Sequence, residues 1–134
     1  MSLNILNHIL VVDDQPNWRL AFKILLESEG LKVSEASGFK EAKEMLTKSA
    51  FDLVILDVRL VDDETFNVQG LELLYSIKAK TPATKVIIVT GYPESVGEKS
   101  EADALIFKVP EGSTFDSRGF KNLIKELVDK SFKS

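Results

Sequence analysis

The chain has 134 residues, of which 44% are hydrophobic and 28% charged, and it contains no cysteine. These values fit one soluble globular domain over residues 1–134 and exclude disulfide frameworks and thiolate metal sites. The net charge of −4 offers no basic stripe for a nucleic acid, and no apolar run approaches the roughly 20 residues of a membrane helix. We therefore expect a cytoplasmic protein whose partners are proteins or small ligands.

The first part of the chain predicts a strand, a helix, a second strand and a second helix. In order, these are His8–Val12, Pro16–Ser28, Lys32–Ala36, and Ser37 to about Lys48. The first run is almost continuously apolar, as expected of a strand that is buried on both faces of a parallel sheet. Pro16 suits the first turn of a helix, Gly30 suits the position after its end, and Ser37 is a candidate cap for the second helix.

The rest of the chain continues this alternation. It predicts, in order, a strand at Leu53–Leu56, a helix at Val68–Lys80, strands at Val86–Val89 and Ala104–Phe107, and a final helix at Asp116–Ser131. Pro93 and Gly97 interrupt the segment between the last two strands, so we expect its helix, the fourth, to be short or irregular. Alternating strands and helices predict a doubly wound α/β domain, in which helices cover both faces of a five-stranded parallel sheet.

Polar residues follow four of the predicted strands: Asp13 and Asp14, Asp57, Thr90, and Lys108. Any one of them is weak evidence, because an Asp after a strand usually caps a turn. In doubly wound sheets, however, ligands bind at the carboxyl ends of the strands, so all of these residues are expected to meet at one edge. Three carboxylates repel one another unless a cation lies between them, and oxygen ligands alone suit Mg²⁺.

Asp57 is the best candidate nucleophile toward phosphorus, because it follows the central buried strand. Metal and Lys108 would stabilise the oxygens in transfer, and Thr90 could hydrogen-bond a phosphoryl oxygen after it.

The same residues resemble a known family, the response-regulator receiver domains of two-component signalling, over essentially the whole chain. The motifs are ILVVDDQPNWRLAFKILLESEG, FDLVILDVRL, VIIVTG and ALIFK. The resemblance implies a phosphorylation site at Asp57, Mg²⁺ ligation by Asp13, Asp14, Asp57 and the backbone carbonyl of Arg59, and switch and phosphate-contact roles for Thr90 and Lys108. It also implies a (βα)5 fold like that of flavodoxin.

The sequence departs from the family pattern in four places. Residues 61–67 form an apparent insert, which we expect to be a flap beside the site, and Lys108 is followed by Val109 before the proline. Leu105 stands where the family usually has a switch aromatic, and the interval from Thr90 to Lys108 is short. We therefore expect output to arise from reordering of residues 91–102.

The favoured function is a regulatory phosphoacceptor, rather than an enzyme that acts on external substrates. A histidine kinase, a phosphotransfer protein or a small phosphodonor would phosphorylate it. The signal would then pass to a downstream output protein or to an output domain outside this chain. Two alternatives are a pseudo-receiver that makes constitutive protein contacts and a phosphatase with an aspartyl nucleophile. Retention of the acidic residues with Thr90 and Lys108 argues against the first, and the lack of an evident second acid or base argues against the other.

Overall fold

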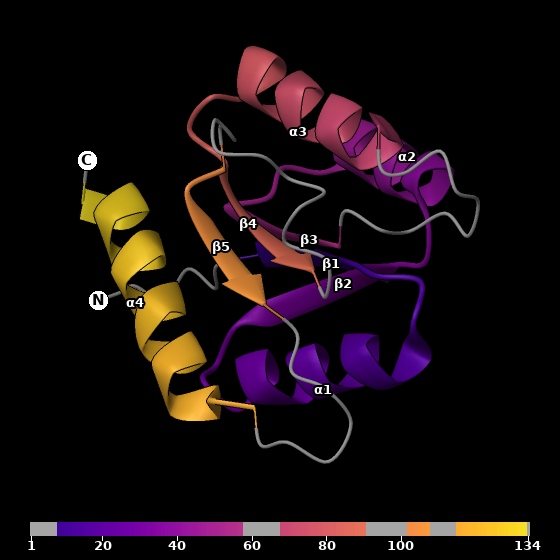
Figure 1. Ribbon diagram of the computed structural model, residues 1–134. Coiled ribbons are helices and arrows are strands. Elements are labelled where there is room, and N and C mark those ends of the chain that lie inside the picture. The colour runs from indigo at the N-terminus through magenta and orange to yellow at the C-terminus, as the bar shows by residue number, and fades with distance from the viewer. Residues whose placement is uncertain (1–7, 58–67, 91–101, 108–114, 134) are drawn as a thin grey trace.

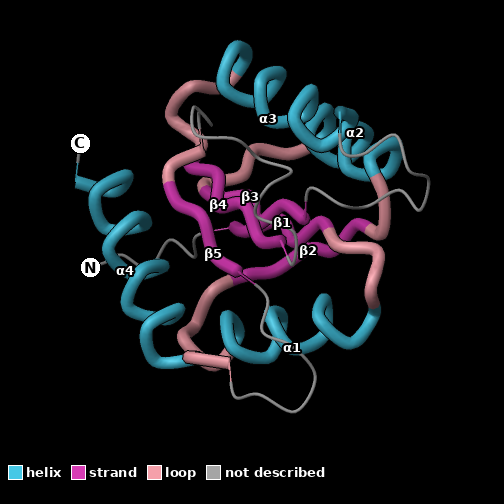
Figure 2. The backbone as a smooth tube through the Cα atoms, in the orientation of Figure 1, coloured by secondary structure: helices cyan, strands magenta, loops and turns pink. Residues whose placement is uncertain are grey.

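The computed structural model describes residues 8–57, 68–90, 102–107 and 115–133. Its strands are β1 (His8–Val12), β2 (Lys32–Ala36), β3 (Leu53–Asp57), β4 (Lys85–Thr90) and β5 (Ala104–Phe107). They pair in parallel in the order β2-β1-β3-β4-β5, with β3 at the centre (Figure 2). The predicted five-stranded parallel sheet is confirmed.

Helices cover both faces of this sheet (Figure 1). They are α1 (Pro16–Glu27), α2 (Phe39–Lys48), α3 (Val68–Lys80) and α4 (Ser117–Lys133). One core cluster packs α2 and α3 against one face of the sheet, and the other packs α1 and α4 against the opposite face. Successive strand residues alternate between the clusters, with Leu10 and Val12 in the first and Ile9 and Val11 in the second. Both faces of β1 are therefore buried, which explains its continuous apolar sequence.

The start of α2 differs from the sequence prediction. Gly38 is the cap residue, and Ser37 does not cap the helix with its side chain. Instead, the Ser37 backbone N–H and hydroxyl both donate to Glu41 Oε1, at 2.8 and 3.2 Å. The carboxylate of the first turn thus reaches back to the residue before the cap. The sequence pattern placed a capping residue one position too early.

Gly30 ends the first helical segment as predicted. Its φ is +82°, a conformation that glycine adopts without the steric cost paid by other residues. Its N–H donates to the carbonyl of Glu27, and the N–H of Leu31 donates to the carbonyl of Leu26.

The final helix, α4, is capped at its start by Asp116, whose Oδ1 accepts a 2.9 Å hydrogen bond from the N–H of Gly119.

Several sequence predictions fall outside the residues that the structure describes. They concern the insert at 61–67, all but the last residue of the segment 92–102 with the short or irregular helix, and the stretch after Lys108 where Val109 precedes the proline. Leu105 is described: it lies in β5 and is 41% exposed. Among the described residues, no helix is long and apolar enough to cross a membrane. Cytoplasmic residence stays a prediction.

The surroundings of His8 lead us to expect a fold whose stability depends on pH. Its ring centroid lies 4.3 Å from that of Phe51, and its Nε2 is 2.8 Å from the hydroxyl of Ser34. Burial, and then the nearby Lys32 ammonium, hold the pKa of His8 below its usual value of 6.5, while Asp52 opposes them. The folded state therefore favours neutral histidine.

We expect the free energy of unfolding to fall as the pH decreases from neutral through about 6.5. The reason is that a histidine in the unfolded chain takes up its proton near pH 6.5, whereas folded His8 does so only at lower pH. Urea unfolding at several pH values measures this change. His8 is the only histidine, so the variant His8→Gln should show a flatter profile over the same range. Equal slopes for the two proteins would contradict the prediction.

Candidate metal centre

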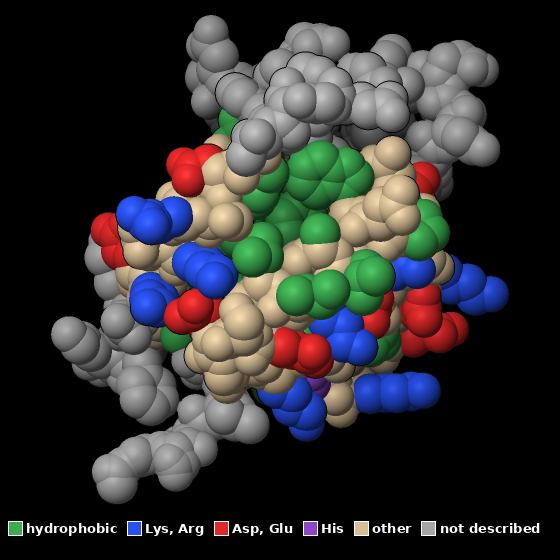
Figure 3. Space-filling view, turned by 90° about the horizontal axis from the view of Figure 1, so that it is seen from below, with side chains coloured by type: hydrophobic (Ala, Val, Ile, Leu, Met, Phe, Trp, Pro, Cys, Tyr) green, Lys and Arg blue, Asp and Glu red, His purple; other side chains and the backbone are tan. Residues whose placement is uncertain are grey.

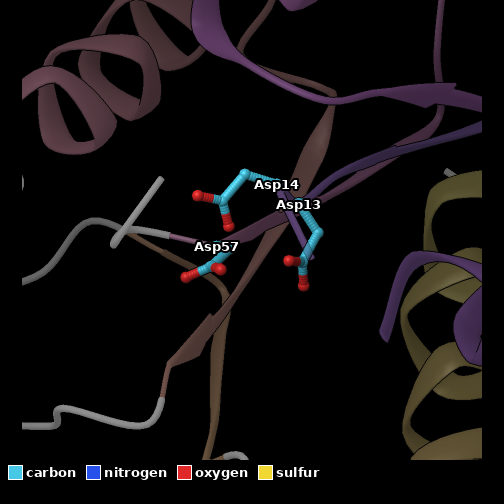
Figure 4. A group of neighbouring side chains, drawn as sticks. All are labelled: Asp13, Asp14 and Asp57. Carbon is cyan, nitrogen blue, oxygen red and sulfur yellow. The ribbon is translucent and has the colours of Figure 1, made fainter. Parts of the chain in front are cut away.

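Three aspartates meet at the carboxyl ends of β1 and β3, which are neighbouring strands. Asp13 and Asp14 directly follow β1, and Asp57 is the last residue of β3. Each offers a carboxylate oxygen, and these oxygens all lie within 4.8 Å of one another. Figure 4 shows the three side chains converging from the two strand ends. The predicted convergence of these three residues is therefore present in the structure.

The aspartates differ in exposure although two of them are adjacent in sequence. Asp13 and Asp57 are 1% and 3% exposed, whereas Asp14 is exposed to solvent. The cluster thus combines two buried carboxylates with one that reaches solvent.

Hydrogen bonds from two elements fix the position of Asp13. Its N–H donates to the carbonyl of Ala36 at the end of β2, and its Oδ1 accepts from the N–H of Gln15 at 2.9 Å. Its backbone carbonyl accepts a 2.7 Å hydrogen bond from Nη1 of Arg19 in α1, and Nε of the same arginine pairs with Glu35 at 3.2 Å. The acidic turn is therefore held by both β2 and α1.

Arg19 was not identified from the sequence. It lies one to two helical turns beyond the acidic pair, among residues that read simply as an amphipathic helix. Its partner at the site is the backbone carbonyl of Asp13. Every residue has such a carbonyl, so the sequence does not indicate which one an arginine contacts. The only available signal was an opposite charge, Glu35, on the following strand.

The donor set fits a hard divalent cation. All three donors are carboxylate oxygens, which suit Mg²⁺ or Ca²⁺ rather than a soft metal. Without a cation, three carboxylates this close would repel one another, and two of them are withdrawn from water. The residues present are thus compatible with a bound Mg²⁺.

The remaining predicted site residues are described less fully. Thr90 is the last residue of β4, and its neighbour Val89 pairs with Asp57, so its backbone lies at the same edge of the sheet. The Thr90 side chain, Arg59 and Lys108 lie outside what the structure describes. Their roles stay predictions.

The chain is thus a doubly wound α/β domain with an acidic cluster at the ends of its first and third strands. The family model described as "Response regulator receiver domain" matches residues 9–108. The chain belongs to this family, the receiver domains of two-component response regulators.

The sequences of individual relatives support this family assignment. Sporulation initiation phosphotransferase F of Bacillus subtilis is 32% identical over 123 residues, covering 90% of this chain and 92% of that protein. The alginate biosynthesis transcriptional regulatory protein AlgB of Pseudomonas aeruginosa is 37% identical over 84 residues, or 63% of this chain. The match spans only 18% of AlgB, and the same share of several other curated regulators that the chain resembles.

Solved structures share the fold over nearly the whole chain. A CheY-like receiver domain protein from Methanospirillum hungatei JF-1 superposes with a TM-score of 0.78 at 31% identity, covering 96% of this chain and 98% of that one. The response regulator TrrA of Thermotoga maritima, solved in complex with Mg²⁺ and BeF, gives a TM-score of 0.76 at 31% identity, covering 91% and 99%. Receiver domains generally bind Mg²⁺ in an acidic pocket.

Proposed function

We propose that this chain is a phosphoacceptor receiver, in which Asp57 takes a phosphoryl group and Asp13 and Asp14 hold the Mg²⁺ that the transfer requires. The observation that carries the proposal is the position of Asp57. It is almost fully buried at the end of the central strand, within 4.8 Å of the other two carboxylates. The likeness to TrrA, whose structure holds Mg²⁺ and BeF, supports it.

The proposed reaction is a nucleophilic displacement at phosphorus. One carboxylate oxygen of Asp57 attacks the phosphorus of the donor, and the bond from phosphorus to the donor breaks. With acetyl phosphate the leaving group is acetate, and with a phosphohistidine it is the imidazole nitrogen. Bound Mg²⁺ would neutralise charge on the transferring oxygens. Burial of Asp57 at the end of β3 would limit its motion before the donor arrives.

The other assigned roles complete this proposal. The carbonyl of Arg59 would be a further metal ligand, Lys108 would contact the phosphoryl group, and Thr90 would bind it after transfer. The chain would catalyse only its own phosphorylation and dephosphorylation. Its signal would then pass to a separate output protein or to an output domain outside this chain.

The direct test is the intact mass of the protein after treatment with acetyl phosphate, with and without Mg²⁺. We expect a gain of one phosphoryl group that depends on the metal. A protein that gains no phosphoryl mass with acetyl phosphate or a phosphorylated histidine protein would favour the pseudo-receiver alternative.

An apolar surface beside the site supports a protein as phosphodonor. Leu20 and Ile24 are 55% and 57% exposed on α1, and Ala21 between them is also exposed. Figure 3 shows apolar side chains gathered on the face of the molecule that α1 occupies. Because α1 begins at Pro16, directly after the acidic turn, a partner on this surface would lie beside that turn. We propose a histidine kinase or phosphotransfer protein as that partner.

The double variant Leu20→Ser, Ile24→Ser should separate the two kinds of donor. Loss of two apolar contacts is expected to slow transfer from a phosphorylated histidine protein by about tenfold. Phosphorylation by acetyl phosphate, which needs no protein surface, should keep its rate. Equal slowing with both donors would place the effect in the site instead of the docking surface.

A further inference from the structure

A cavity lies at the end of the sheet opposite the aspartates. It has a volume of about 560 Å³ and lies between α2 and α3. Residues just before β3 and β4 complete its lining. Phe51, which lines the cavity, and Asp57 in the metal centre are six residues apart along an extended segment. They are therefore separated by about 20 Å. The cavity is therefore distinct from the proposed phosphorylation site.

The cavity has an apolar floor and a charged rim. Phe51, Leu73 and Ile77 form the floor and belong to the core cluster on this face. Lys43 in α2 and Lys80 at the end of α3 are exposed at the rim. The lining contains one carboxylate, Glu72, against these two ammonium groups. The local charge is thus positive, opposite in sign to the net charge of −4.

The wall on the strand side is fixed before any ligand arrives. The hydroxyl of Thr84 donates to the carbonyl of Phe51 at 2.9 Å, and its N–H donates to the carbonyl of Thr81. The Thr84 carbonyl accepts a 3.0 Å hydrogen bond from Nζ of Lys78, which also pairs with Asp103 at 2.6 Å. A ligand would meet a formed cavity, so little binding energy would be spent on ordering the protein.

We propose that this cavity binds a small amphipathic anion, with an aromatic or short aliphatic body on the floor and a carboxylate or sulfonate at the two lysines. Sites for small molecules commonly measure about 300 to 1,000 Å³ and combine apolar walls with a few polar groups that orient the ligand. This cavity meets both conditions. The hydroxyl of Thr84 already bonds within the protein, and the two lysines are the cations of the lining that a charged head could meet.

The probe for the test is anilinonaphthalene sulfonate, an aromatic anion of suitable size whose fluorescence rises on binding. Amide chemical shifts on titration should change most in residues 43–51 and 72–84. The uncharged analogue phenylnaphthylamine should bind more weakly. Shifts centred on α1, where Leu20 and Ile24 are exposed, would overturn the proposal, as would equal binding of the uncharged analogue.

A pair of variants matched in charge isolates the two lysines. Lys43→Glu with Lys80→Glu should weaken binding by about tenfold, because two ion pairs become repulsions. The control is Lys40→Glu with Lys48→Glu, which makes the same change in net charge at exposed positions of α2 outside the lining. Equal losses in the two double variants would show that only net charge matters and would overturn the site.

Ser76→Trp is a third variant that fills the cavity, since Ser76 is part of its lining. Binding should be lost while the thermal unfolding transition stays cooperative. Unchanged binding in a folded Ser76→Trp protein would place the probe elsewhere and refute the proposal.

Discussion

Asp57→Asn should abolish phosphorylation of this chain. The amide has nearly the same shape as the carboxylate but is a far poorer nucleophile toward phosphorus, so no acyl phosphate can form. Asp57 is 3% exposed and ends the central strand, so the same-shaped amide should fit its place without disturbing the core. After acetyl phosphate and Mg²⁺ treatment, the variant should keep its unmodified mass while the wild type gains a phosphoryl group.

Asp52→Asn is the matched control, since Asp52 lies just before the start of the same strand, at the opposite edge of the sheet. Its carboxylate accepts a 3.0 Å hydrogen bond from the N–H of His8, which an asparagine oxygen can also accept. This variant should be phosphorylated like the wild type. A phosphoryl gain in Asp57→Asn would instead move the phosphoacceptor to another residue, which peptide mapping would identify.

Asp14→Asn should weaken Mg²⁺ binding while leaving the fold intact. Asp14 is exposed, so the screening of bulk water applies to its charge. Two unit charges about 4 Å apart attract by about 1 kcal/mol in water, and a divalent ion doubles this to about 2 kcal/mol, or roughly a 30-fold change in affinity. Calorimetric titration with Mg²⁺ measures the effect, which should shrink as salt is added.

Glu44→Gln, an exposed carboxylate on α2 away from the pocket, removes the same charge elsewhere and should leave the affinity almost unchanged. A similar loss in both variants would mean that Mg²⁺ responds only to net charge. An Asp14→Asn protein with wild-type affinity would remove Asp14 from the ligand set.

The sequence alone was sufficient to predict the order of the strands and helices that the structure describes, and the meeting of three aspartates. Strands buried on both faces must be apolar throughout, so runs such as Leu53–Leu56 are recognisable without knowledge of their neighbours. A parallel sheet brings the carboxyl ends of its strands to one edge, which placed Asp57 beside Asp13 and Asp14. The resemblance to receiver domains rested on these same residues.

Tertiary structure decided the features that depend on contacts between distant segments. Arg19 fixes the acidic turn through a backbone carbonyl, and Glu41 reaches back to Ser37 while Gly38 takes the capping position. The contacts of Arg19 have no local sequence pattern, because they join α1 to the acidic turn and to β2. The contact between Glu41 and Ser37 spans only four residues, and the structure shows that it replaces the predicted Ser37 cap.

The unequal exposure of Asp13 and Asp14, adjacent in sequence, also arises from packing. The hydrogen bonds of Asp13 to the end of β2 and to Arg19 hold it against the sheet, whereas Asp14 is exposed to solvent. The cavity between α2 and α3 is likewise a property of how two amphipathic helices meet over one sheet face. Periodicity tells which side of a helix is buried, but the space left between two buried sides depends on their distance and angle, which only the folded chain sets.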